Sequence, residues 1–190
     1  MGHIRSPDPL LLVIAAFSRH PPALAWAEEQ LEREFGPVAL TSLDLSFHQT
    51  RYYEPSMGPN LRKRFLAFRD LVSADCLPPV KRRTNELEQE LAQAENYPEV
   101  RPLNLDPGVL SLGKFLLATT KDQAHRIYLR DGILAEVTLR FQAGAFEPWP
   151  WTYADYREPA VRAFLKEARG YYRQRLRALR ETEDPDPDMT

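Results

Sequence analysis

Residues 101–141 constrain the fold of this chain more than any other stretch. Apolar and polar residues alternate there with the period of two that is typical of β-strands. The alternation predicts strands over residues 103–106, 114–121, 125–130 and 133–141. Asp131 and Gly132 predict a two-residue hairpin turn between the last two strands, because such a turn requires positive φ angles. The sequence therefore predicts an antiparallel meander in the second half of the chain.

Helices and further strands alternate in the rest of the chain. Apolar spacing predicts strands over residues 10–18, 38–47 and 64–72, and helices over residues 21–35, 78–94 and 158–180. We expect Pro107 and Gly108 to turn the chain after the strand at 103–106. The first six elements match the order of a ferredoxin-like sandwich. We therefore predict an α+β fold with a ferredoxin-like βαββαβ core, extended by an antiparallel meander and a C-terminal helix.

The length of 190 residues fits one domain. We expect residues 10–180 to form this domain, preceded by a disordered N-terminus at residues 1–9. Residues 181–190 are acidic and contain prolines, which is typical of a disordered tail.

The overall composition restricts the partners and the compartment. The net charge of -2 gives no general attraction for nucleic acid or for an anionic membrane. The apolar run at residues 10–17 is too short to span a bilayer. The one cysteine, Cys76, cannot form an internal disulfide and suits a reducing compartment. We expect no membrane partner, and the composition argues against nucleic acid.

Common cofactor motifs are missing from the sequence. It contains no phosphate loop of the GxxxxGK[ST] type and no glycine-rich dinucleotide fingerprint, so the sequence leaves the cofactor undetermined. The four histidines do not have the spacing of a metal site, and no metal ligand is predicted.

The predicted hairpin places a histidine beside a carboxylate. With Asp131 and Gly132 as the turn, His125 would lie opposite Thr138. His125 and Glu136 would share one face, and Arg126 would lie on the other. A histidine and a carboxylate on a half-apolar face can tune each other's pKa and perform acid–base chemistry. The alternative is a buried histidine whose hydrogen bonds are satisfied by its neighbours.

Polar residues on the second predicted helix share one face. Lys81, Asn85 and Glu88 stand at positions i, i+4 and i+7, beside the apolar stripe that faces the core. Such side chains could hold a ligand at the rim of the buried face. The alternative is a solvated helix face with an ordinary salt bridge.

Two further places combine polar groups with rigid surroundings. Asn104 and Asp106 point to the same side of a short strand, and Asp106 precedes the expected turn. The carboxylate could act on a ligand or stabilise the turn. Tyr53 and Glu54 lie in a loop, where an aromatic ring and an acid can stack on and hydrogen-bond a base or sugar. The same ring could instead cover an edge of the core.

Several sequence blocks together resemble one bacterial family. They are Tyr52–Tyr53–Glu54 with Met57–Gly58, Lys81 with Thr84–Asn85 and Glu88, residues 104–108, Lys121 with residues 125–129, Gly132–Ile133, Ala135–Glu136 with Thr138–Leu139, and Trp151–Thr152–Tyr153 with residues 155–157. The pattern is similar to the family catalogued as domain of unknown function 4416. It spans roughly residues 10–172, with Ser56 in place of an acid and Val109 in place of a tyrosine. The resemblance implies a cytoplasmic bacterial protein and no particular activity.

These observations lead to two hypotheses. In the first, a polar cleft binds a small phosphorylated or nucleotide-like ligand, with acid–base chemistry in reach. The candidate catalytic residues are His125, Glu136 and Asp106. The candidate ligand-binding residues are Tyr53, Glu54, Lys81, Asn85, Glu88, Asn104, Lys121 and Arg126. In the second hypothesis the chain is a binding or scaffolding module, and these residues hold the sheet together.

Overall fold

The computed structural model describes residue 3 and residues 6–183 of the chain. Its fold is α+β, as predicted, with one large antiparallel sheet. The strands are β1 (Leu10–Ser18), β2 (Val38–Thr41), β3 (Leu45–Phe47), β4 (Leu61–Val72), β5 (Asn104–Leu110), β6 (Lys114–Thr119), β7 (Ile127–Arg130), β8 (Ile133–Gln142) and β9 (Ala145–Pro148). The helices are α1 (Pro21–Phe35), α2 (Glu54–Met57), α3 (Leu77–Gln93), the 3₁₀ helix η1 (Ala154–Arg157) and α4 (Pro159–Glu183).

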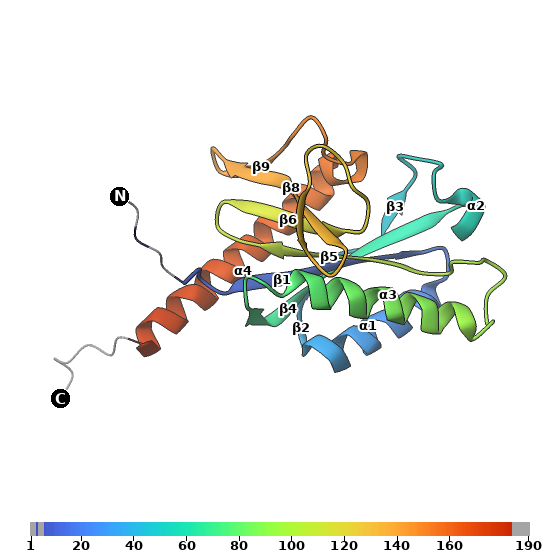
Figure 1. The fold of residues 1–190 in the computed structure, drawn as a ribbon, viewed down its shortest axis with the longest axis horizontal. Helices are drawn as coiled ribbons and strands as arrows, with labels where there is room; N and C mark the ends of the chain where they lie inside the picture. The colour runs from blue at the N-terminus through green and yellow to red at the C-terminus, as the bar shows by residue number, and fades with distance from the viewer. Residues whose placement is uncertain (1–2, 4–5, 184–190) are drawn as a thin grey trace.

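Helices cover both faces of the sheet (Figure 1). The apolar sides of α1 and α3 pack on one face, and the apolar stripe of α4 packs on the other. The central strand β1 lies between these layers, which explains its continuous apolar sequence. Leu12 and Ile14 belong to the core under α1 and α3, whereas Leu11 and Val13 belong to the core under α4.

The strands follow the order β2-β4-β1-β5-β6-β8-β7, with β3 paired to β4 and β9 paired to β8. The predicted meander is therefore present in the second half of the chain. The strand predicted over residues 38–47 is wrong in one respect, because it is interrupted and forms the separate strands β2 and β3. Both pair with β4, which is long enough at twelve residues to hold them in succession.

The turn predicted at Pro107 and Gly108 is wrong, because both residues lie inside β5. The backbone groups of neighbouring residues in a strand point to alternate sides, so Pro107 has the same orientation as Leu105. The amide and carbonyl of Leu105 bond to side chains of α3 and not to β1. The missing N–H of Pro107 therefore falls on the side away from β1, where it removes no bond to that strand.

Strands β5 and β6 are joined over only three residue pairs, Gly108 to Leu110 with Leu117 to Phe115. Before Gly108 the two strands separate, and α3 replaces the missing neighbour. Lys81 Nζ donates to the carbonyl oxygen of Leu105 at 2.8 Å, and the amide of Leu105 donates to Glu88 Oε1 at 2.7 Å. Both side chains are buried. Two helix side chains thus satisfy the backbone amide and carbonyl of Leu105, on the edge of β5 that β6 leaves unpaired.

The hairpin turn is confirmed, since Asp131 and Gly132 have φ angles of 56° and 75°. The predicted register is correct only next to the turn, where Arg130 pairs with Ile133. A bulge between Tyr128 and Arg130 then shifts the pairing by one residue, so that Ile127 lies opposite Ala135. The predicted pairing of His125 with Thr138 is therefore wrong, and β7 begins only at Ile127.

Residues near both ends of the described chain extend or contact helix α4. Helix α4 continues three residues beyond Arg180, to Glu183. Pro9 accepts a hydrogen bond from the hydroxyl of Tyr172 at 2.8 Å, and Asp8 pairs with Arg180 at 3.0 Å. Of the two ends that were expected to be disordered, residues 1, 2, 4, 5 and 184–190 lie outside the described residues.

Replacing Gly108 with alanine would force β5 away from β6. A Cβ atom there would lie 2.4 Å from the carbonyl oxygen of Leu116 and 2.6 Å from the ring of Phe115. We expect Gly108→Ala to lower the free energy of unfolding by about 1–3 kcal/mol in urea titrations. Gly113→Ala, between the same strands, is the control, because a Cβ there meets no atom within 4 Å. It should change stability by less than about 0.5 kcal/mol. Equal losses in both variants would contradict this account.

Candidate functional site

A cavity of about 460 Å³ opens where β5 and β6 separate. Its volume is in the range of small-molecule sites. Strands β1, β4, β5, β6 and β8 supply its walls, and the segments before α2 and around η1 close it. The lining residues are Phe17, Phe47, Gln49, Thr50, Tyr52, Tyr53, Lys63, Lys81, Asn85, Arg101, Asn104, Asp106, Leu117, Ala118, Thr119, Thr120, Lys121, Gln123, Glu136, Tyr153, Ala154, Asp155 and Tyr156.

The cavity brings together most of the side chains that the sequence singled out. The predicted site residues that line it are Tyr53, Lys81, Asn85, Asn104, Asp106, Lys121 and Glu136. Glu88, His125 and Arg126 do not line it, although each bonds to a residue that does. Glu54 also lies outside the lining; its side chain is exposed and lies 4.0 Å from Arg51.

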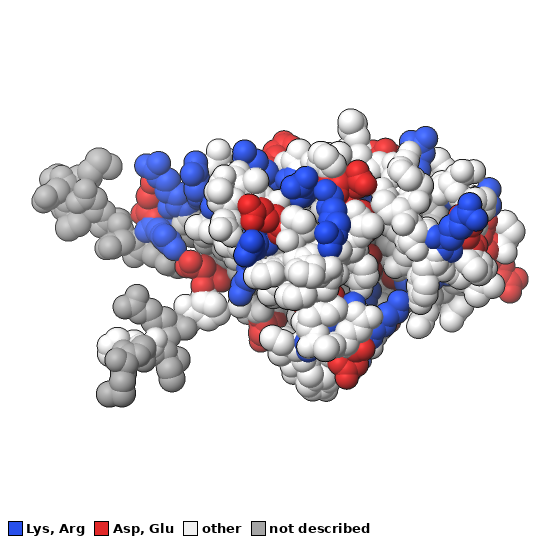
Figure 2. Space-filling model, turned by 90° about the horizontal axis from the view of Figure 1, so that it is seen from above, with Lys and Arg blue, Asp and Glu red and all other residues white. Residues whose placement is uncertain are grey.

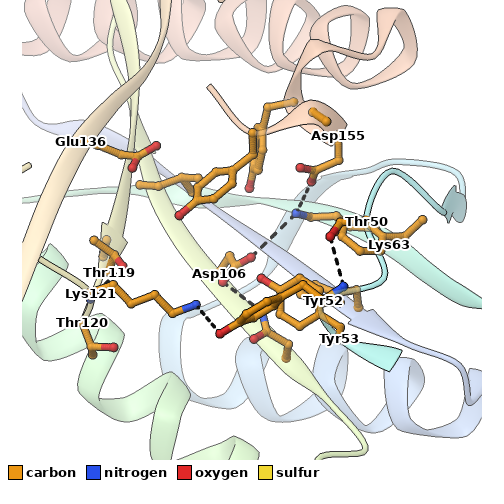
Figure 3. Close-up of a pocket in the computed structure, with 18 of the residues that line it drawn as sticks. Thr50, Tyr52, Tyr53, Lys63, Asp106, Thr119, Thr120, Lys121, Glu136 and Asp155 are labelled. Atoms are coloured by element: carbon orange, nitrogen blue, oxygen red, sulfur yellow. Dashed lines mark hydrogen bonds and ion pairs between the residues drawn. The ribbon is translucent and has the colours of Figure 1, made fainter. Parts of the chain in front are cut away.

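The floor of the cavity contains a buried lysine that sequence reasoning missed. Lys63 is 3% exposed, and its ammonium lies 2.6 Å from Asp155 and 3.7 Å from Asp106 (Figure 3). It also faces four aromatic rings, with the ring of Tyr156 closest at 4.4 Å. A signal was available, because Lys63 is in phase with the buried Phe65, but the predicted strand began one residue too late.

One polar network runs along β5. The guanidinium of Arg101 donates to Glu88 at 2.7 Å and to the side-chain oxygen of Asn104. Asn104 in turn donates to Asp106 at 2.9 Å, and Asp106 faces Lys63. This network joins the edge of β5 to the floor of the cavity. Arg101 was not among the predicted site residues, because it lies in a loop without a periodic pattern.

A second network is centred on Glu136 of β8. His125 lies 3.1 Å from Glu136 Oε2, and Arg126 Nε donates to the same oxygen at 2.9 Å. Thr138 donates to Oε1 at 3.2 Å. The predicted contact of His125 with Glu136 is confirmed, but the predicted placement of Arg126 on the opposite face is wrong. The reason is that β7 begins only at Ile127, so His125 and Arg126 precede the strand and do not alternate between its faces. Both side chains therefore reach Glu136.

The rim of the cavity carries an exposed cation. Lys121 Nζ lies 3.1 Å from the hydroxyl of Tyr52 and 4.5 Å from the centre of its ring (Figure 3). Both residues are exposed. The hydrogen bond and the charge of Lys121 lower the pKa of Tyr52. Lys121 follows the end of β6, opposite the segment before α2, so that its side chain crosses the opening.

Burial and neighbouring charges set the protonation of Asp106 and Tyr53 in the cavity. Burial acts to raise the pKa of Asp106, but Lys63, Lys81 and Asn104 together hold it below its usual value. Burial, with Asp106, raises the pKa of Tyr53 well above its usual value. Near neutral pH, Asp106 is therefore an acceptor, and Tyr53 can donate a hydrogen bond.

Some lining side chains retain open hydrogen-bonding groups. Within the described part of the chain, the side-chain amide of Asn85 and the hydroxyl of Tyr53 make no hydrogen bond, and the buried hydroxyl of Tyr156 has no partner. Lys81, Glu136 and Arg126 are instead occupied by protein partners. The open groups are the ones that a ligand would meet.

Among residues 3 and 6–183, no group of three or more His, Cys, Asp or Glu side chains could hold a metal ion. None of the helices in that part of the chain is both long enough and apolar enough to cross a membrane.

The model of the family described as domain of unknown function (DUF4416) matches residues 8–172. The chain belongs to this family. The resemblance predicted from the sequence blocks is thus confirmed, and the matched part includes every residue that lines the cavity. No curated protein matches the chain.

Arg126 and Glu136 form a buried pair whose disruption should be costly. Each side chain is 1% exposed, so removing the guanidinium leaves a buried carboxylate without its main counter-charge. We expect Arg126→Met to lower the free energy of unfolding by about 3–5 kcal/mol in urea titrations. Arg130→Met is the control, because its pair with Asp131 is half-exposed at 3.7 Å. It should cost less than about 1 kcal/mol. Comparable losses would show that the buried network does not stabilise the fold.

Proposed function

We propose that the cavity binds a small phosphorylated or nucleotide-like ligand. The observation that carries this proposal is the exposed Lys121 ammonium at the mouth of a cavity whose inner wall is built from aromatic rings. An anionic group bound at the mouth leaves the remainder of the ligand facing those rings. No part of the proposal requires a metal ion or a resident cofactor.

Two cations at the opening favour a phosphate there. Lys121 contacts a neutral phenol, which is a weaker acceptor than a phosphate oxygen. Arg101 lines the same cavity with its side chain 36% exposed, and it has further N–H groups beyond those bonded to Glu88 and Asn104. A phosphate bound between them would form charge-assisted hydrogen bonds without any change in the buried networks.

Aromatic side chains near the opening support a ligand with a planar or sugar-like part. Tyr52 is 66% exposed, and its ring meets that of Tyr53 edge to face at 5.1 Å. Tyr53 is packed against Phe17 and Phe47, which fix its orientation. An exposed ring on a rigid support is the arrangement used for stacking against bases and sugars.

Acid–base chemistry at this site would depend on Asp106 and not on His125. Both oxygens of Glu136 are already bonded, and His125 lies outside the cavity lining. Asp106 lines the cavity with its side chain 27% exposed, and its lowered pKa keeps it ionised near neutral pH. It can therefore accept a hydrogen bond from a ligand, although its lowered pKa makes it a weak base.

The scaffold hypothesis is favoured for part of the predicted site. Lys81 and Glu88 satisfy the backbone of Leu105, and Arg126 satisfies Glu136. We propose that these four side chains hold the walls of the cavity, and that Tyr53, Asn85, Asn104, Asp106 and Lys121 face the ligand.

The proposal extends to the core, the compartment and the partners. The order β2-β4-β1-β5, with α1 and α3 on one face, supports a ferredoxin-like core in the first part of the chain. The single cysteine supports a cytoplasmic location. Basic side chains lie among acidic ones on the face seen in Figure 2, which supports a small ligand over nucleic acid.

Removing the charge of Lys121 tests the proposal. We expect Lys121→Gln to weaken binding of AMP at least tenfold in calorimetric titrations at low salt, because a charge-assisted bond contributes about 1.5–3 kcal/mol. Lys114→Gln is the matched control, since Lys114 is an exposed lysine at the opposite end of β6. It should leave the affinity for AMP unchanged. Equal affinities of the two variants, or a wild-type protein that binds no phosphorylated compound, would refute the proposal.

A further inference from the structure

The hydroxyl of Tyr156 stands out among the groups inside the cavity. Tyr156 lines the cavity, is 1% exposed, and its hydroxyl has no hydrogen-bond partner among the described residues. A buried hydroxyl without a partner is costly, and native proteins retain few of them. Such a group in a cavity wall indicates a bound molecule that completes its hydrogen bonding.

The position of this hydroxyl is fixed by packing. The ring of Tyr156 stacks on Phe115 at 5.9 Å and meets Phe65 edge to face at 5.6 Å. Burial is the main cause of its raised pKa, followed by the charges of Asp106 and Asp155. The raised pKa keeps the hydroxyl protonated near neutral pH, and both carboxylates line the same cavity.

The floor of the cavity and its rim have different chemistry. At the floor, the two carboxylates of Asp106 and Asp155 outnumber the ammonium of Lys63, which is already paired with both. The floor therefore does not favour an anion, and its carboxylates can accept hydrogen bonds. Tyr156 can donate a hydrogen bond. A ligand hydroxyl group can bond to both kinds of side chain, because it donates to a carboxylate and accepts from a phenol. At the rim, Lys121 and Arg101 attract an anion. A ligand that fits both ends carries a phosphate at one end and hydroxyl groups at the other.

We propose that the ligand is a sugar phosphate whose hydroxyl end lies at the floor between Tyr156 and Asp106, with its phosphate at the rim. Tyr156 is then a specificity-determining residue, because it distinguishes hydroxylated phosphate esters from plain ones. This inference rests on the proposed function of the cavity and adds the class and the orientation of the ligand.

Two probes of equal charge test the inference. Ribose 5-phosphate carries hydroxyl groups, and propyl phosphate carries none. In calorimetric titrations we expect the wild-type protein to bind ribose 5-phosphate at least tenfold more tightly than propyl phosphate. Tyr156→Phe should lose most of this preference and leave the affinity for propyl phosphate unchanged. Its denaturant midpoint should not fall, because the removed hydroxyl has no protein partner.

Tyr172→Phe is the matched control, because the hydroxyl of Tyr172 donates to the carbonyl oxygen of Pro9. This variant should have a lower denaturant midpoint and an unchanged preference for ribose 5-phosphate. Equal affinity of the wild-type protein for both probes, or an unchanged preference in Tyr156→Phe, would overturn the inference. The proposed function would survive that result if propyl phosphate binds and Lys121→Gln weakens its binding. Binding of neither probe would overturn both.

Discussion

The separation of β5 from β6 is the constraint on which the rest of the structure depends. A strand that loses its neighbour inside a protein leaves backbone groups that must find other partners. Here the helix α3 supplies them, through Lys81 and Glu88 on the backbone of Leu105. Without these two buried side chains, the amide and the carbonyl of Leu105 would lose their partners where the cavity opens. The charges of α3 thus belong to the architecture of the sheet.

The polar side chains around the cavity form two networks. Glu88, Arg101 and Asn104 connect the edge of β5 to Asp106, while Arg126 and His125 hold Glu136 in the opposite wall. Removing one member leaves its partner charged and buried, which costs more than an ordinary surface pair. The cavity is therefore rigid in its walls and open in its interior. Side chains with open hydrogen-bonding groups can therefore be substituted without breaking the two networks that hold the walls.

The sequence predicted much of the fold where the residues carry a period or a turn signal. The apolar run of β1, the spacing of α1 and the Asp131–Gly132 turn identified their elements correctly. The prediction from the sequence failed where tertiary packing outweighed the local preference of a residue. Pro107 reads as a turn residue, yet it lies in β5 because its side of that strand has no ladder bond to lose. The bulge in β7 was not predicted, because the alternation of apolar and polar residues does not change at that position.

The cavity also depends partly on local sequence and partly on tertiary packing. By itself, the sequence determined which polar residues lie on apolar elements, and seven of those now line one cavity. Only the tertiary structure decided which of them remain free. Lys81 is occupied by a backbone carbonyl, whereas Lys121 extends over the opening. It also decided that Lys63 and Tyr156 belong to the floor, since burial of a charge or a hydroxyl depends on which distant segments pack around it. Local periodicity indicates which face of an element a side chain occupies, whereas its partners depend on how the elements pack together.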